Sequence, residues 1–562
     1  MGIAQHESCF GAARREELPG VPPMTSQCLP FSQIPHTTKL FSDYISDFQK
    51  VARFYSSSPY EKEWVRTRAV PERLDPVRRG RVTDALERQN RIWGASGRTL
   101  ENIAKLRRGA AAVVTGQQVG LFGGPAFSIY KALSALRLAQ QAREAGVEAV
   151  PIFWLATTDH DLAEINHVSI PGPQGTLRKF ASETSGTLNA PVGKIVLQEE
   201  IQALVEAAAE LLGDTDVTTA LCESYRPGVT LGDAYGHLFT RVFSDWGLVL
   251  LDADDPDLHA IAAPIYRTAI EKSADLDAQL LKRGKELETA GYHQQVKVTP
   301  SSTLLFSLHG GARVPIHRRP NGGREPEFLI EDERVSRENL LERISAAPEE
   351  FSANVLLRPV IQDYLLPTIA YIGGAAEVAY FAQVDVVYRA LLGDATPILP
   401  RFSATIIEPK VGKMMERYGL SLPELFHGIE PLRETLAIKT LPDGVQGAFD
   451  QADQAVAKSL AAVSEHLEKL DKTLSDSTKQ AANKMKYQLK RLRGRAARAK
   501  LAREEILGRH AEILINALCP EKALQEREVA GIYFLARYGS EFLQKLYDQV
   551  NTDCLDHQVI TL

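Results

Sequence analysis

The amino-acid sequence predicts an α/β protein with a parallel-sheet core and a helical hairpin towards its C-terminus. Its clearest feature is a short apolar run at Ala110–Thr115, then a glycine-rich loop, a helical pattern over about Ala126–Glu144 and a second apolar run at Val150–Ala156. Strand, loop, helix and strand form one βαβ unit, which is the building block of parallel sheets. Between Pro442 and Pro520 the chain has no proline, and its apolar residues recur with the heptad spacing of a coiled coil.

The composition is that of an ordinary globular protein. The chain has 562 residues, 44% of them hydrophobic and 24% charged, and its length predicts about three or four domains. A net charge of −6 gives no general attraction to nucleic acid or to an anionic membrane. The first residues lack the apolar core of a signal peptide, and no run approaches the roughly 20 apolar residues of a membrane span. We therefore expect a cytoplasmic protein with neither nucleic acid nor a membrane as a partner.

The cysteines indicate a reducing compartment. They are far apart in the chain and match neither a zinc motif nor a plausible disulfide framework. The five residues are Cys9, Cys28, Cys222, Cys519 and Cys554.

The same patterns place the remaining elements. Leu248–Leu251 is a strand candidate followed by Asp252, Asp254 and Asp255, so we expect these carboxylates at the edge where the other strands end. Two strands around Gly310–Gly311 predict a β-hairpin and a small inserted domain, after which the core resumes. The hairpin strands are Thr303–His309 and Arg313–Arg318, and further strands are Ile369–Ile372 and Ile398–Ile407. Further helices are Phe41–Tyr55, Val82–Ala95, Leu100–Arg108, Glu199–Leu212, Tyr235–Phe243 and Ile261–Gly291, the last with Pro264 in its first turn.

The proline-free segment predicts two long helices that fold back on each other. Ser475–Thr478 interrupts the heptad pattern and is the expected turn of an antiparallel coiled-coil hairpin. Several seam residues of the second helix are alanine, which leaves surface for another subunit, so we expect a homodimer through this arm. The first seam is Val456, Leu460, Val463, Leu467, Leu470 and Leu474, and the second is Leu489, Leu492, Ala496, Ala499, Ile506, Ile513 and Ala517.

The glycine-rich loop is the first candidate binding site. It follows a predicted strand and opens a helix, so its backbone amides could cradle a phosphate group. It matches neither the dinucleotide-binding fingerprint nor the Walker motif, and its glycines could equally serve a tight turn and close packing. The candidate substrate-binding residues of this loop are Gly116, Gln117, Gln118, Gly123 and Gly124.

The densest polar cluster of the chain follows the second strand. Asp159, His160 and Asp161 are the candidate catalytic residues, since a histidine between carboxylates could act as a general base. Asn166 and His167 are candidates for substrate binding. The alternative is that the cluster only caps the next helical turn, with Asp161 as the N-cap. Its spacing matches no established metal signature, so no metal site is predicted.

A third candidate region lies in the resumed core. Arg358 could hold a carboxylate or phosphate with two parallel hydrogen bonds, or could form an ion pair inside the domain. The other candidate residues here are Gln362, Asp363, Gly373 and Gly374. In parallel α/β sheets ligands bind outside the carboxyl ends of the strands, where all three regions are expected.

Four long motifs resemble one enzyme family over nearly the whole chain. They are TGQQVGLFGGP (115–125), PIFWLATTDHDLAEINH (151–167), LLRPVIQDYLLPTIAYIGGAAEVAYFAQ (356–383) and LQEREVAGIYFLARYG (524–539). They are similar to the bacillithiol biosynthesis cysteine-adding enzymes, called BshC. This resemblance implies a Rossmann-like parallel-sheet core with two connecting-peptide insertions and a C-terminal antiparallel coiled coil.

The resemblance also implies a division of the chain and a reaction. The expected parts are an N-terminal arm with the first part of the core (1–176), a first insertion (177–230), core (231–284), a second insertion with the hairpin (285–345), core (346–440), the coiled-coil arm (446–518) and a C-terminal segment (519–562). The implied reaction joins L-cysteine to the amine of glucosaminyl-malate, the last step of bacillithiol synthesis. Activation of the cysteine carboxylate by ATP, with Mg²⁺ accompanying the nucleotide, is the expected chemistry, and His160 would assist removal of a proton from the amine.

Two other functions stay open on the sequence alone. One is a nucleotidyl- or glycosyltransferase that acts on a sugar. The other is a non-catalytic dimeric scaffold that binds a metabolite.

Overall fold

A computed structural model describes residues 23–61, 63, 65, 74–183, 189–321, 324–471, 474–501, 504–551 and 554–562. The chain forms two compact units. The larger comprises Met1–Ile170, Arg178–Thr405 and Glu526–Ile560, and the smaller comprises Pro171–Leu177, Ile406–Gln525 and Thr561–Leu562.

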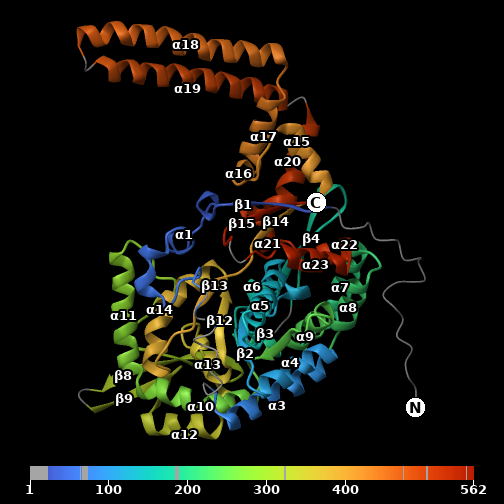
Figure 1. The fold of residues 1–562 in the computed structure, drawn as a ribbon, viewed down its shortest axis with the longest axis vertical. Helices are drawn as coiled ribbons and strands as arrows, with labels where there is room; N and C mark the ends of the chain where they lie inside the picture. The colour runs from blue at the N-terminus through green and yellow to red at the C-terminus, as the bar shows by residue number, and fades with distance from the viewer. Residues whose placement is uncertain are drawn as a thin grey trace. The chain divides into compact units, whose positions relative to one another are not determined.

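The core of the larger unit is a five-stranded parallel sheet in the order β13–β12–β2–β3–β6 (Figure 1). Its strands are β2 (Ala111–Gln117), β3 (Ala149–Leu155), β6 (Val249–Asp252), β12 (Thr368–Gly373) and β13 (Ile398–Pro400). In chain order this is the 3-2-1-4-5 arrangement of Rossmann folds, and the strand order reverses between β2 and β12. Residues of β2 and β3 are almost entirely buried, which explains their uninterrupted apolar sequences.

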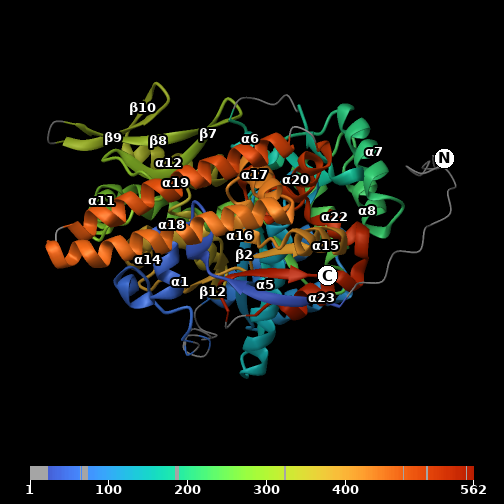
Figure 2. The same ribbon diagram turned by 90° about the horizontal axis from the view of Figure 1, so that it is seen from above.

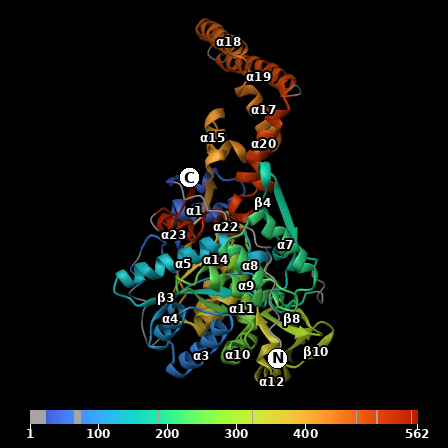
Figure 3. The same cartoon turned by 90° about the vertical axis from the view of Figure 1, so that its right-hand side faces the viewer.

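Helices cover this sheet and connect its strands. Helix α5 (Phe127–Glu144) joins β2 to β3, as the βαβ pattern predicts. Helices α7, α8 and α9 belong to the same unit (Figure 3), where α8 packs against both of the others. The other helices of this unit are α1 (Lys39–Ser46), α3 (Pro76–Ile92), α4 (Gly97–Arg107), α6 (Leu162–Ile165), α7 (Glu200–Leu212), α8 (Asp216–Ser224), α9 (Leu231–Val242), α10 (Pro256–Glu271), α11 (Ser273–Thr289), α12 (Arg337–Ala346), α13 (Arg358–Leu365), α14 (Ala375–Leu391), α22 (Gly531–Tyr538) and α23 (Ser540–Gln549).

The predicted hairpin is the centre of a second, antiparallel sheet in the order β10–β9–β8–β7–β11. Its strands are β7 (Ser302–His309), β8 (Ala312–Asn321), β9 (Arg324–Ile330), β10 (Glu333–Val335) and β11 (Phe351–Ala353). The strand pair was predicted from the turn around Gly310–Gly311, and both glycines have positive φ there. The shorter outer strands carried no comparable signal.

Three predicted elements differ from the structure by more than a shift of their ends. The helix predicted over Ile261–Gly291 is two helices, α10 and α11, and Pro264 lies inside α10 because that helix already begins at Pro256. The strand predicted over Ile398–Ile407 is divided between β13 and β14 (Ala404–Ile407), which belong to different sheets. The helix predicted over Phe41–Tyr55 ends at Ser46 and continues as short 3₁₀ turns.

The terminal segments meet in a small sheet with the order β1–β15–β14. Strand β1 spans Thr25–Leu29 and β15 spans His557–Thr561. A disulfide joins Cys28 to Cys554, so the prediction that no cysteines pair is wrong for these two. Their sequence separation of 526 residues gives no local signal for such a bond.

The smaller unit is helical and contains the predicted hairpin. Helices α18 and α19 run side by side (Figure 2) and contact each other. Helix α18 ends at Leu470 and α19 begins at Leu474, so Ser475–Thr478 is inside α19 and the predicted turn is wrong by a few residues. The second seam is divided between α19 and α20. The helices are α15 (Pro409–Tyr418), α16 (Leu422–Leu425), α17 (Ile429–Lys439), α18 (Asp443–Leu470), α19 (Leu474–Leu501) and α20 (Glu505–Leu518). No helix in the described parts of either unit is long and apolar enough to cross a membrane.

Candidate functional site

A cavity of about 850 Å³ lies in the larger unit, where β2 and β12 end. Its wall includes Gly116 at the end of β2, Asp159 after β3 and Gly374 before α14. The carboxyl ends of these strands flank the position where the strand order reverses, which is the place where Rossmann folds bind ligands. The volume is in the range of small-molecule sites.

The glycine loop packs closely, and the amides of three of its glycines are already bonded. The amides of Gly120, Gly123 and Gly124 donate to Gln118 O, Tyr225 Oη and Leu121 O, respectively. A Cβ at Gly116 would lie 2.8 Å from Trp154 O, and Gly123, with φ +82°, faces Leu238 and Phe239 rather than the cavity. Of the two interpretations left open by the sequence, close packing fits the contacts that these glycines make.

Two glutamines of the loop hold charged groups at the cavity wall. Gln118 Nε2 donates to Asp159 Oδ2 at 2.6 Å and to Glu164 Oε2 at 3.1 Å. Gln117 Oε1 accepts a hydrogen bond of 2.9 Å from Lys131 Nζ. Gln117, Gln118, Asp159 and Glu164 all line the cavity, so the loop and the segment after β3 form one polar wall.

His160 is held by an arginine from the second sheet. Nη1 of Arg313, on β8, lies 3.0 Å from Nδ1 of His160. Arginine can only donate, so Nδ1 must accept, and the proton of the neutral ring is on Nε2. Burial and the Arg313 charge lower the pKa of His160, which keeps the ring neutral at pH 7. His160 therefore presents an N–H donor to the cavity and has its basic nitrogen occupied.

Arg313 is itself fixed on all sides. Its Nε donates to Ser352 Oγ and its Nη2 to Ala353 O, and its guanidinium lies over the Phe306 ring at 3.9 Å. Burial lowers the pKa of Arg313 to about 10, so it is still charged at neutral pH.

Arg358 also lines the cavity, at the start of α13. Its Nη1 donates to Gln362 Oε1 at 3.1 Å and its Nη2 to Tyr380 Oη at 3.0 Å. These partners are neutral, so the guanidinium charge is not neutralised by a directly bonded carboxylate among the contacts described.

Several predicted residues lie away from the cavity. Asp161 accepts from Glu164 N as the N-cap of α6, and Gln362 is fully buried behind Arg358. Asp363 accepts from Thr396 Oγ1. Gly373 packs against Ile398, and Asn166 donates to Ser182 O, whereas the neighbouring His167 does line the cavity.

The aspartates after β6 form a separate network. Asp252 accepts from Thr157 Oγ1 and Asp254 N, and burial raises the pKa of Asp252 to about 6. Asp255 caps α10 and pairs with Arg88. They lie at the carboxyl end of β6, but none of them lines the cavity.

Sequence reasoning missed a buried ion pair at the floor of the site. Lys131 Nζ lies 2.5 Å from Glu377 Oε2 and also donates to Gly116 O at 2.6 Å. Glu377 Oε2 accepts from Gly374 N at 2.7 Å, which closes the N-terminus of α14. A single lysine among apolar residues of a helix, and a glutamate three residues after a helix N-cap, were the available signals. Arg401, Arg527 and Glu528 also line the cavity and were not predicted.

No group of three or more metal-ligating side chains is found among the described residues.

Comparisons with known proteins agree with this architecture. The family model described as "Bacillithiol biosynthesis BshC, N-terminal Rossmann-like domain" matches residues 24–402, and the model for the BshC C-terminal coiled-coil domain matches residues 404–562. The chain belongs to the bacillithiol biosynthesis BshC family. The predicted Rossmann-like core and C-terminal coiled coil are thereby confirmed.

Relatives in this family are similar over nearly their whole length. A protein of Koribacter versatilis (strain Ellin345) is 48% identical over 537 residues, which cover 96% of this chain and 100% of the relative. A protein of Solibacter usitatus (strain Ellin6076) is 36% identical with the same coverage. One of Geobacillus thermodenitrificans (strain NG80-2) is 28% identical and covers 91% of this chain and 96% of the relative. All three carry the name "Putative cysteine ligase BshC".

Proposed function

We propose that this chain is a cysteine ligase that joins the carboxyl group of L-cysteine to the amine of glucosaminyl-malate in the cavity at the end of β2 and β12. The observation that carries the proposal is one polar wall that combines the carboxylates of Asp159 and Glu164 with the N–H donor of His160. Membership of the bacillithiol biosynthesis family and the name of the relatives support the choice of substrates.

The amine of glucosaminyl-malate must lose a proton before it can attack. Asp159 and Glu164 attract the protonated amine, and Asp159 is the better candidate to accept the proton because it is next to His160. His160 Nε2–H is suited to donate to the oxygen on which negative charge develops during attack. This assignment differs from the general-base role that the sequence suggested for His160, because Arg313 occupies Nδ1.

We propose that ATP activates the cysteine carboxylate. A phosphoanhydride bond of ATP would break as the carboxylate gains a phosphate-linked leaving group, and the amine would displace that group when the amide forms. The amides of Gly120, Gly123 and Gly124 are already bonded, so side chains are better placed than the loop backbone to hold phosphate oxygens. Arg401 and Arg527 at the cavity wall are the candidates, with Mg²⁺ accompanying the nucleotide.

A matched pair of variants tests the site. Asp159→Asn should lower kcat at least a hundredfold, because it removes the proton acceptor. Asp161→Asn makes the same change two residues away, keeps the helix cap and should leave kcat near the wild-type value. Formation of the thiol product, followed by mass spectrometry, is the assay. Equal turnover of the two variants would remove Asp159 from the mechanism.

We also propose that the coiled-coil arm forms a homodimer. Apolar side chains are exposed on α18 and α19, with 46% of Val463, 79% of Leu470 and 53% of Leu492 accessible. Leu492→Glu should give a monomer in light scattering after size exclusion, whereas the adjacent Arg491→Glu should stay dimeric. A wild-type monomer at micromolar concentration would contradict this proposal.

We also propose a cytoplasmic location for the protein, which cell fractionation tests.

A further inference from the structure

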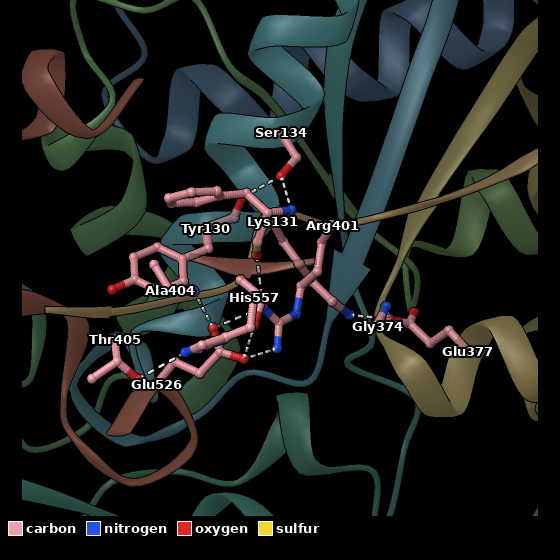
Figure 4. Close-up of polar contacts among 12 residues, drawn as sticks. Tyr130, Lys131, Ser134, Gly374, Glu377, Arg401, Ala404, Thr405, Glu526 and His557 are labelled. Carbon is pink, nitrogen blue, oxygen red and sulfur yellow. Dashed lines mark hydrogen bonds and ion pairs between the residues drawn. The ribbon is translucent and has the colours of Figure 1, made fainter. Parts of the chain in front are cut away.

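Arg401 lies at the wall of the cavity, directly after β13. Figure 4 shows its guanidinium beside the carboxylate of Glu526. Its backbone N–H donates to Gly373 O at 2.8 Å, which fixes the residue beside the end of β12. The side chain is 8% exposed, so its guanidinium is almost fully enclosed.

One edge of this guanidinium is bound by a buried carboxylate. Nη2 lies 2.6 Å from Glu526 Oε1, and Nη1 lies 3.1 Å from Glu526 Oε2. Nη1 uses its second hydrogen on Phe402 O at 2.7 Å. The two hydrogens at the tip of the guanidinium, one on each terminal nitrogen, therefore both have Glu526 as their acceptor.

The lateral edge of the same guanidinium has no protein acceptor among the described residues. This edge carries Nε–H and the second hydrogen of Nη2, which point in parallel and match the two oxygens of a carboxylate or phosphate. A Cβ built on Gly374 would lie 3.5 Å from Nε, so the glycine leaves this edge uncovered. Both residues line the cavity.

Glu526 is held as firmly as the arginine that it binds. Its Oε1 also accepts from Ser403 Oγ at 2.9 Å, and its Oε2 from Ala404 N at 3.0 Å, while only 1% of the side chain is exposed. Burial raises the pKa of Glu526, but the Arg401 charge and these hydrogen bonds lower it by more. The pKa of Glu526 therefore lies below its ordinary value, and the carboxylate is ionised.

His557 on β15 completes the support without adding a charge. Because Ser403 donates to Glu526, its oxygen accepts from His557 Nδ1, at 2.7 Å, and Nε2 accepts from Thr405 Oγ1, at 2.8 Å. Burial lowers the pKa of His557 to about 4, which keeps the ring neutral. The C-terminal segment thus sets the orientation of Arg401 through Glu526.

Two other cations of the cavity, Lys131 and Arg313, are more completely engaged. Lys131 Nζ has three acceptors: Gly116 O, Gln117 Oε1 and Glu377. Arg313 donates from Nε and from both terminal nitrogens. A second positive charge, Arg527, lines the cavity on the same segment as Glu526, and burial, followed by the Arg401 charge, lowers the pKa of Arg527.

We propose that the lateral edge of Arg401, oriented by Glu526, binds one oxyanion group of a substrate through two parallel hydrogen bonds. Arg401 is the binding residue, and Glu526 is a positioning residue. The oxyanion is a carboxylate of L-cysteine, a carboxylate of the malate moiety or a phosphate of the nucleotide. The identity of these three molecules rests on the proposed function, whereas the oxyanion chemistry does not.

Equilibrium binding to the full-length chain tests the proposal, with L-cysteine, L-malate and ATP titrated separately by calorimetry. Arg401→Lys keeps the charge but removes the planar fork, and it should weaken binding of one of the three ligands at least tenfold and leave the others unchanged. Glu526→Gln places an amide donor against Arg401 or Ala404, which disturbs the orientation of Arg401. Binding of the same ligand should therefore weaken.

Asp385→Asn is the matched control. Asp385 binds Arg283 in another buried ion pair, which does not line the cavity. This variant should lower the melting temperature without changing any of the three affinities. Wild-type affinities in Arg401→Lys, or binding of none of the ligands by the wild-type chain, would overturn the proposal. Tighter binding by Glu526→Gln would overturn the positioning role.

The outcome is separable from that of the proposed function. Product formation by the wild-type chain is measured in parallel. Ligand-specific loss of binding without any thiol product would refute the ligase and leave the oxyanion site standing. Product formation by the wild-type chain, with unchanged ligand binding in Arg401→Lys, would refute the oxyanion site and leave the ligase standing.

Discussion

Replacing Glu377 by glutamine removes the charge that faces Lys131 and keeps the shape of the side chain. Only 4% of the lysine side chain and 17% of the glutamate side chain are exposed. Breaking a buried ion pair from one side costs about 3–5 kcal/mol of unfolding free energy, because the remaining charge is buried without its partner. Lys131 keeps Gly116 O and Gln117 Oε1 as acceptors, so we expect about 3 kcal/mol, near the lower end of this range.

Urea unfolding of the full chain measures this loss. Glu87→Gln is the control, because Glu87 pairs with Arg91 on the surface of α3 and its loss should cost at most about 1 kcal/mol. The double variant Lys131→Met/Glu377→Gln should recover part of the stability, since neither charge is then buried alone. Equal losses for Glu377→Gln and Glu87→Gln would refute the reasoning.

The pH dependence of this loss has a definite sign. Burial raises the pKa of Glu377, but the Lys131 charge and the Gly374 amide lower it more, so it lies below the ordinary value. The stabilisation is therefore fully present above the pKa of the unfolded chain and is lost as the pH falls through the lowered pKa of the folded chain. The difference between wild type and Glu377→Gln should be constant near neutral pH and shrink in acid.

Three further predictions concern the cavity and its border. Arg313→Gln should raise the pKa of His160, because the Arg313 charge adds to burial in lowering it, and NMR titration of the His160 ring measures the change; an unchanged titration would contradict this electrostatic role of Arg313. Gly116→Ala places a Cβ 2.8 Å from Trp154 O and should cost about 1–3 kcal/mol of unfolding free energy, measured with urea, together with a loss of turnover. Wild-type stability would show that β2 and β3 can move apart to accommodate the methyl group. Asp252→Asn should stabilise the chain at pH 7 by up to about 3 kcal/mol, because burial raises the pKa of Asp252 from 3.8 to about 6, and this gain should vanish below about pH 4; a gain independent of pH would contradict the assignment.

The central sheet could be predicted because buried parallel strands are continuous apolar runs. Leu248–Leu251 and Ile369–Ile372 were found in this way, within one or two residues of β6 and β12. The strand order could not be read, because β12 pairs with β2 across more than two hundred residues of sequence. The reversal of strand order between them, which locates the cavity, is a property of that long-range pairing.

The site was predictable where its residues are neighbours in the chain. Asp159 and His160 stand together after β3, and the cavity contains both. Arg313 comes from the inserted sheet and Glu526 from the C-terminal segment, and a single charged residue has no local pattern that marks it. Asp161 shows the opposite error, because an aspartate before a helical turn is most simply an N-cap, which is the role that it has here.

The central claim is that this cavity joins cysteine to an amino sugar. The most direct test is mass spectrometry of the wild-type chain incubated with L-cysteine and glucosaminyl-malate, with ATP present or omitted. We predict a product whose mass is the sum of the two substrates less one water, formed only with ATP. Recovery of both substrates unchanged in the presence of ATP would contradict the claim.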